Sequence, residues 1–140
     1  MQRDIEATPD TIYRIGRTSK AITATALARL VDNQQIALDT PINNYLADLP
    51  NPAWREITPR MLLSHMSGIA HYPQRDLEKD YYGLYLVLSL SKHYDDMRSA
   101  LEVFDGTSMR SKSGTEFYYS SQGTVLLAAV MAAEVNKPYM

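Results

Sequence analysis

A single strand-like pattern, followed only by helical patterns, constrains the fold of this chain more than any other feature. Residues 11–15 carry Ile and Tyr between the turn signal Pro9-Asp10 and Gly16, which predicts a short strand. After Gly16 we expect helices and loops. A lone strand leaves backbone N–H and C=O groups unpaired, so we expect it to pair with another chain or to belong to a larger fold.

Two longer segments have the apolar period of an α-helix. Apolar residues recur at three- and four-residue steps from about Thr18 to Asp32. A last helix is predicted from about Ser121 to Val135. Four side chains of this last helix are expected to point inward: Leu126, Leu127, Val130 and Met131.

Shorter helices are predicted between these two. Asp39-Thr40-Pro41 and Thr58-Pro59 each place a capping side chain before a proline, and the second should open a helix over 60–66. Asp95 is expected to cap a helix with apolar residues on one face over 97–104. Residues 73–93 are ambiguous between a loop and an apolar helix, and 105–115 are expected to form a loop.

The composition excludes several classes of protein. The 140 residues suffice for one ordinary domain, and the net charge of −2 without a Lys/Arg cluster argues against a nucleic-acid partner. The lack of cysteine excludes a disulfide framework, thiolate metal sites and a cysteine nucleophile. No apolar stretch approaches the roughly 20 residues of a membrane span, and no signal peptide follows Met1. The cellular compartment stays open.

The histidines give no metal site. His65, His71 and His93 are spaced by six and 22 residues, which fits no compact zinc motif, so we expect ordinary hydrogen-bonded histidines. No glycine-rich loop for phosphate and no Gly-x-Ser-x-Gly nucleophile motif is present. The sequence therefore predicts neither a cofactor nor a metal.

Three segments carry the functional signal. Residues 13–23 read Tyr-Arg-Ile-Gly-Arg-Thr-Ser-Lys-Ala-Ile-Thr, residues 62–72 read Leu-Leu-Ser-His-Met-Ser-Gly-Ile-Ala-His-Tyr, and residues 114–123 read Gly-Thr-Glu-Phe-Tyr-Tyr-Ser-Ser-Gln-Gly. In this order they resemble the serine β-lactamase-related family, which includes class C β-lactamases, penicillin-binding peptidases and related esterases. The middle segment is most similar to the branch of the mitochondrial serine β-lactamase-like protein and its bacterial relatives. The resemblance covers about residues 8–139.

The resemblance implies a fold larger than this chain. That fold is the α/β fold of β-lactamases and DD-peptidases, and residues 1–140 would form a single partial domain of it. About residues 1–16 would be the end of a strand, and 17–140 would be the helical subdomain, with one or two strands in all. The family's third motif, Lys-Thr-Gly or His-x-Gly on a later strand, is absent from the sequence. Family members are commonly periplasmic or exported.

The resemblance also assigns the site residues. The family uses a serine at a helix start, a lysine three residues later on the same helix face, and a tyrosine from a separate segment. The lysine corresponds to Lys20, the tyrosine to Tyr119, and Ser121 takes the place of an asparagine. The nucleophile position is occupied by Arg17, whose guanidinium stays protonated with a pKa above about 12. We therefore predict a truncated, catalytically inactive relative of hydrolases that transfer acyl groups from amides or esters.

Other readings stay open. Ser19 and Thr18 should face away from Lys20, and Ser89, the first residue of the chain's Ser-x-x-Lys pattern, is expected to match by chance. Lys20 could be a solvent-reaching helix lysine, and Arg17 could bind an anionic ligand. The chain could also be a non-catalytic binding or assembly module that self-associates, or a half that works only when another polypeptide complements it. The substrate, a small molecule or peptide in the family, cannot be read from the sequence.

Overall fold

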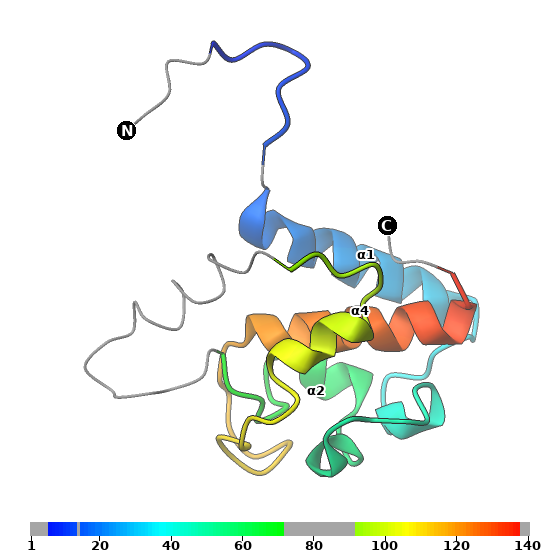
Figure 1. Cartoon of the computed structure of the whole chain (residues 1–140). Helices are drawn as coiled ribbons and strands as arrows, with labels where there is room; N and C mark the ends of the chain where they lie inside the picture. Colours follow the sequence, from blue (N-terminus) through cyan, green and yellow to red (C-terminus); the bar gives the residue numbers. More distant parts are fainter. Residues whose placement is uncertain (1–5, 14, 72–91, 138–140) are drawn as a thin grey trace.

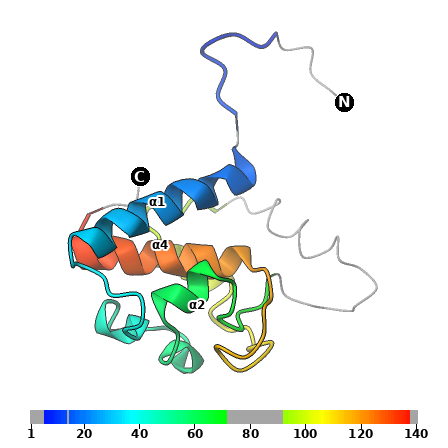
Figure 2. The ribbon, with the colours of Figure 1, turned by 180° about the vertical axis from the view of Figure 1, so that it is seen from behind.

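The helix predicted near the C-terminus lies at the centre of the structure. The computed structural model describes residues 6–13, 15–71 and 92–137 (Figure 1). Helix α4 (Ser121–Val135) lies between α1 (Ser19–Asp32) and the short α2 (Pro59–Leu63), and contacts both. Figure 2 shows the same three layers from behind. Single 3-10 turns are described at Gly16–Thr18, Ile42–Asn44, Pro52–Trp54 and Ser99–Val103.

Helix α4 is buried along most of its length because its sequence is apolar on nearly every side. It begins after the capping residue Ser120, whose Oγ accepts a hydrogen bond from the Gly123 N–H at 3.1 Å. It ends at Asn136, which adopts the left-handed conformation with φ of 47°. The four side chains expected to point inward are all buried, so the prediction for this helix is confirmed.

Helix α1 buries only one of its faces. Thr23 and Leu27 are buried, whereas Ile22 is 58% exposed. A hollow of about 510 Å³ lies between α1 and α4, and its apolar lining includes Ile15, Ile22, Ala26, Leu30, Met131 and Val135. The predicted helix is confirmed, and this part of its surface has no covering element among the described residues.

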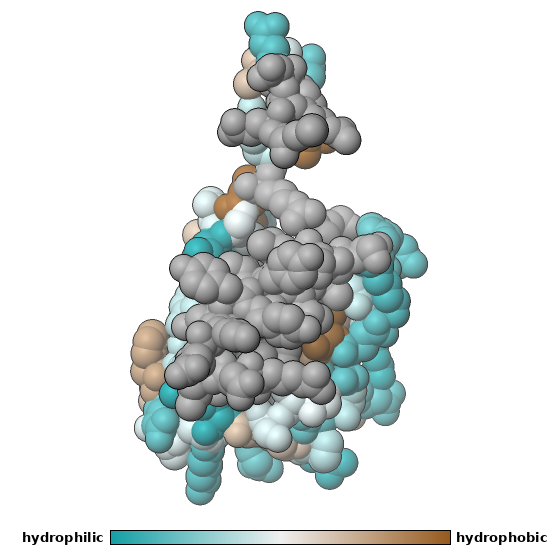
Figure 3. Space-filling view, turned by 60° about the vertical axis from the view of Figure 1, so that its left-hand side comes forward, coloured by the Kyte–Doolittle hydropathy of each residue, from teal (hydrophilic) through white to brown (hydrophobic). Residues whose placement is uncertain are grey.

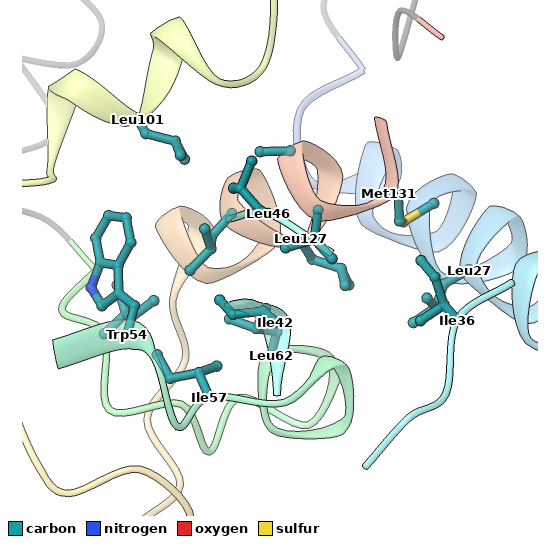
Figure 4. Close-up of a cluster of buried hydrophobic side chains, with 14 of the residues drawn as sticks. Leu27, Ile36, Ile42, Leu46, Trp54, Ile57, Leu62, Leu101, Leu127 and Met131 are labelled. Atoms are coloured by element: carbon teal, nitrogen blue, oxygen red, sulfur yellow. The ribbon is translucent and has the colours of Figure 1, made fainter. Parts of the chain in front are cut away.

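The main core is built around α4 and shares Met131 with the lining of this hollow. The rings of Trp54 and Phe104 are 5.3 Å apart between centroids and close one end of it. Figure 4 shows side chains from α1, α2, α4 and the turns between them converging on one cluster. Its labelled members are Leu27, Ile36, Ile42, Leu46, Trp54, Ile57, Leu62, Leu101, Leu127 and Met131.

The two proline-based helix starts behave differently. Thr58 Oγ1 accepts a hydrogen bond from the Met61 N–H at 3.3 Å, and α2 follows as predicted but ends at Leu63. The turn after Pro41 has no side-chain cap, and the neighbouring Asp39 accepts two hydrogen bonds from Arg60 at 2.7 and 2.8 Å. Only a 3-10 turn follows, so the expectation of a helix after Pro41 was wrong.

The segment after residue 95 also differs from the prediction. Asp96, and not Asp95, accepts a hydrogen bond from the Ser99 N–H at 2.8 Å. The residues that follow form the 3-10 turn Ser99–Val103 in place of an α-helix. Leu101 and Phe104 are nonetheless buried, which confirms the expected apolar face. The ambiguous residues 73–91 and Ser89 lie outside the described residues.

The predicted strand does not form in residues 11–13. The Thr11 N–H donates to the Thr8 carbonyl at 3.0 Å, and the Thr8 N–H donates to Thr11 Oγ1 at 2.8 Å, which makes a turn. Ile12 is 97% exposed. A strand is stabilised by backbone bonds to a neighbour, and no segment in the described part of the chain supplies them. The division of the chain at about residue 16 stays a prediction.

In the view of Figure 3, teal hydrophilic side chains gather along one edge of the body. Brown patches appear where the N-terminal segment meets the body. Within the described residues, no helix has both the length and the apolar character needed to cross a membrane.

Candidate active site

The start of α1 places two cationic side chains on one helix face. Gly16, with φ of +54°, turns the chain into the 3-10 turn that precedes α1. Arg17 lies in this turn and Lys20 in the first turn of α1, three residues later. Side chains three residues apart lie on the same face of a helix, so both can reach one partner. Arg17 is exposed and Lys20 is half-buried.

The segment 118–121 is fixed against the loop after α2 by four hydrogen bonds. The Tyr118 N–H donates to the His65 carbonyl at 2.8 Å, and Ser120 Oγ donates to the Ala70 carbonyl at 3.0 Å. Two histidine rings accept the next backbone groups. The Ser120 N–H donates to His65 Nδ1 at 3.4 Å and the Ser121 N–H to His71 Nδ1 at 2.9 Å. These bonds fix the direction in which Tyr119 points.

The loop after α2 depends on a close backbone approach at Gly68. Its φ is +75°, and a Cβ atom there would lie 2.2 Å from the Ser111 carbonyl oxygen. The Arg110 N–H donates to the Gly68 carbonyl at 2.8 Å. Glycine therefore permits the turn and also leaves room for the backbone of the loop at Ser111.

The cations of α1 meet the tyrosine that precedes α4. Lys20 Nζ donates a hydrogen bond to Ser121 Oγ at 3.0 Å and lies 5.4 Å from the centre of the Tyr119 ring. The guanidinium carbon of Arg17 lies 5.9 Å from the centre of the same ring. The structure thus brings together the four residues that the sequence assigned to one site: Arg17, Lys20, Tyr119 and Ser121. Their chemical roles stay predictions.

The Tyr119 hydroxyl lies in a positive environment. Burial would raise its pKa, but the polar and charged groups of Lys20, Ser121 and Arg17 outweigh burial and hold the pKa below the ordinary tyrosine value. Within the described residues, the buried Tyr119 Oη has no partner that meets full hydrogen-bond geometry.

Two histidine rings flank Tyr119. The His65 and His71 rings lie 4.6 and 5.1 Å from the Tyr119 ring between centroids. Burial, and to a lesser degree the charge of Lys20, lowers the pKa of His65. The sequence predicted ordinary hydrogen-bonded histidines and missed this placement. Their position in the segment Leu62–Tyr72, which the resemblance singled out, was the available signal.

Two hydroxyls at the start of α1 were considered as substitutes for the missing nucleophile, and neither has a hydrogen bond to Lys20 or Tyr119 among the described contacts. Ser19 Oγ donates to the Gly16 carbonyl at 2.8 Å, and Thr18 is exposed. Ser121, at the start of α4, does contact Lys20 through its Oγ, but Lys20 is the donor in that contact. A nucleophilic serine would have to give its proton to the lysine.

A small hollow opens beside Lys20. Its volume is about 230 Å³, and it lies between α1, α2 and α4. The residues that line it are Lys20, Ala21, Thr23, Ala24, Leu62, Leu63, His65, Thr124 and Leu127. In the described part of the chain, no group of three or more metal-ligating side chains is gathered.

Comparison with known proteins identifies the family. The sequence model of the β-lactamase family matches residues 1–139, so the chain belongs to this family. The resemblance and the expected β-lactamase/penicillin-binding-protein fold are thereby confirmed.

Individual relatives agree with this assignment. The human mitochondrial serine β-lactamase-like protein LACTB is 34% identical over 83 residues, which cover 56% of this chain and 15% of that protein. The crystal structure of a penicillin-binding protein from Bacillus halodurans has a TM-score of 0.66 and 29% identity. That of a D-stereospecific amidohydrolase from Streptomyces has a TM-score of 0.71 and 28% identity. The matches cover 86% and 91% of this chain but only 34% and 38% of those structures.

Proposed function

We propose that this chain is a β-lactamase-family protein whose acyl-transfer site lacks its nucleophile. One observation carries the proposal: Arg17 precedes Lys20 by three residues and lies with it beside Tyr119. The lysine and the tyrosine of the family pattern are present, and the group that should attack a carbonyl carbon is a guanidinium. The proposed ancestral reaction is acyl transfer from amides or esters.

The chemistry of arginine supports the loss of activity. Acyl transfer needs a hydroxyl or thiol that can lose its proton and share an electron pair with the carbonyl carbon. The guanidinium keeps its proton at every pH at which proteins are stable and has no free electron pair to offer. The other hydroxyls near Lys20 are engaged: Ser19 with Gly16, and Ser121 as an acceptor from Lys20 itself.

Turnover of two chromogenic substrates tests the proposal. Nitrocefin reports cleavage of a β-lactam amide, and p-nitrophenyl acetate reports cleavage of an ester. We expect the chain to release product at the rate of buffer alone. A Lys20→Ala variant provides the control for chance surface reactivity, because it should give the same background. Turnover above background that Lys20→Ala abolishes would contradict the proposal.

The apolar hollow between α1 and α4 supports a second candidate, a non-catalytic assembly module. Ile22 is 58% exposed there, and a self-associating chain would bury it. Sedimentation velocity across a concentration series tests this candidate, with Ile22→Gln as the variant. Association that the variant weakens would support the candidate, and a monomer at every concentration would contradict it.

A further inference from the structure

The two cations beside Tyr119 have no acidic partner among the described residues. The ion pairs in the described part of the chain involve other basic residues, namely Arg60, Lys92, His93 and Arg98. The charged groups of Arg17 and Lys20 instead lie 5.9 and 5.4 Å from the centre of the Tyr119 ring. Two like charges beside one ring, with no acidic partner in the described part of the chain, favour an anion near them.

We propose that Arg17 and Lys20 form a binding site for a small carboxylate with a short apolar tail. The carboxylate would contact the guanidinium of Arg17 and the ammonium of Lys20. Its tail would enter the hollow of about 230 Å³ that begins at Lys20. The inference rests on the proposed function in one respect, namely that Arg17 binds and does not react.

The helix face of α1 connects the two parts of this site. Arg17, Lys20 and Ala24 follow at steps of three and four residues, so they lie along one side of the helix. The hollow below Lys20 is lined chiefly by aliphatic side chains, among them Ala21, Ala24, Leu62 and Leu63. A ligand that is charged at one end and apolar at the other matches this order of groups.

The charged end of the site suits a carboxylate. Planar guanidinium groups bind carboxylates through two parallel hydrogen bonds, and a lysine adds a mobile point charge. The positive environment that lowers the pKa of Tyr119 agrees with this sign of ligand.

The size of the hollow limits the tail. Sites for drug-sized ligands span roughly 300–1,000 Å³, and the hollow beside Lys20 is smaller. A phosphate would satisfy the cations but would leave the aliphatic wall exposed to water. A long fatty acid would extend beyond the hollow. A short-chain acid such as hexanoate fits both the charge and the volume.

The test is a titration in which each ligand is added to the full chain and binding is monitored by 1H–15N correlation spectra. Hexanoate is the probe, hexan-1-ol is its uncharged counterpart, and inorganic phosphate is an anion without a tail. Arg17→Ala removes one cation, and Arg29→Ala removes another exposed arginine of the same helix as the matched control.

We expect saturable shifts with hexanoate at roughly millimolar concentration, because the site is partly open to solvent. Arg17→Ala should weaken binding by about tenfold, the usual effect of losing a charged hydrogen-bond partner, and Arg29→Ala by less than about twofold. Binding should also weaken as salt is added, because an exposed charge pair is screened.

Three results would overturn the inference: no saturable shifts with hexanoate, equal binding by wild type and Arg17→Ala, or phosphate or hexan-1-ol binding as tightly as hexanoate. Hexanoate has no leaving group and cannot acylate the protein. Hexanoate binding and nitrocefin turnover are therefore independent measurements. Absence of hexanoate binding would contradict this inference alone, and turnover of nitrocefin would contradict the proposed function.

Discussion

His65 and His71 hold the segment around Tyr119 by accepting backbone N–H groups on their Nδ1 atoms. A ring nitrogen can accept a hydrogen bond only while it carries no proton, so His65 accepts the Ser120 N–H in its neutral form. Protonation of this Nδ1 atom would set one N–H group against another. His65 thus couples the geometry of the site to pH.

Acid should weaken the fold through His65. Its pKa in the folded chain lies below the ordinary value of 6.5, so the unfolded chain takes up the proton first as the pH falls. The stability that neutral His65 contributes is fully present above pH 6.5. It is lost as the pH falls from 6.5 through the lower pKa of the folded chain. Urea unfolding at about pH 7.5 and about pH 5.5 should show a larger loss of stability for wild type than for His65→Asn.

Asparagine is the appropriate replacement because His65 has φ of 58°, a conformation that asparagine tolerates. The groups that face the His65 ring are Lys20, Tyr119 and Phe117, and these remain in the variant. His93→Asn, at an exposed position, serves as the matched control and should keep the wild-type loss. An equal loss in His65→Asn and wild type would contradict this prediction.

Single residues of the site were predictable only through the motif segments. Lys20 is far in sequence from Tyr119 and Ser121, and the structure places the three together as the resemblance implied. The histidines were not predicted at the site because their mutual spacing has no metal or catalytic pattern. Their contacts with Tyr119 arise from the path of the loop after α2, which local sequence rules do not specify.

Among the elements, one of the two capping signals before a proline predicted its helix. Thr58 caps α2 as expected. The Asp39-Thr40-Pro41 signal is followed by a 3-10 turn without a side-chain cap, and Asp39 makes a tertiary contact with Arg60. The long helices α1 and α4 were predictable because an apolar period sustained over a dozen or more residues outweighs such contacts.

Ser120 should be the most important cap. Its buried Oγ accepts from the Gly123 N–H and donates to the Ala70 carbonyl, so it joins α4 to the loop after α2. Ser120→Ala should lower the free energy of unfolding by about 1–2 kcal/mol, since a cap is lost and a carbonyl loses its donor. Urea unfolding monitored by circular dichroism measures this change.

The control for Ser120 is an exposed serine with a local hydrogen bond. Ser64 Oγ donates to the Arg60 carbonyl on the surface of the protein, and Ser64→Ala should change stability by less than about 0.5 kcal/mol. If the two variants lost the same free energy, the proposed role of Ser120 in joining α4 to the loop would be wrong.

Across the whole molecule, the apolar side chains divide between a filled core and an open face. The core around α4 was predictable from the apolar positions of the two long helices. The strand was predicted wrongly because its pattern describes what residues 11–15 could do with a neighbour, and the described residues supply none. The solved relatives that share the fold are much longer, and this chain spans only about a third of their length.

The core, and not the open face, should determine the stability of the chain. Leu127 is 1% exposed at the centre of the cluster, and Leu127→Ala should cost about 2–5 kcal/mol through lost burial and a cavity. Leu63, which is 44% exposed, provides the same substitution at the surface, and its cost should stay below about 1 kcal/mol. Thermal unfolding distinguishes the two, and a similar cost at both positions would contradict the location of the core.

Intact-mass spectrometry after incubation with a penicillin tests the central claim most directly, because an acyl-enzyme adds the whole mass of the β-lactam. With Arg17 at the nucleophile position, we predict that the chain keeps its unmodified mass. Peptide mapping would locate any adduct, and Ser121→Ala is the informative variant, since Ser121 Oγ is the hydroxyl that contacts Lys20. A stoichiometric adduct on a serine of the wild-type chain, absent from the corresponding alanine variant, would contradict the account.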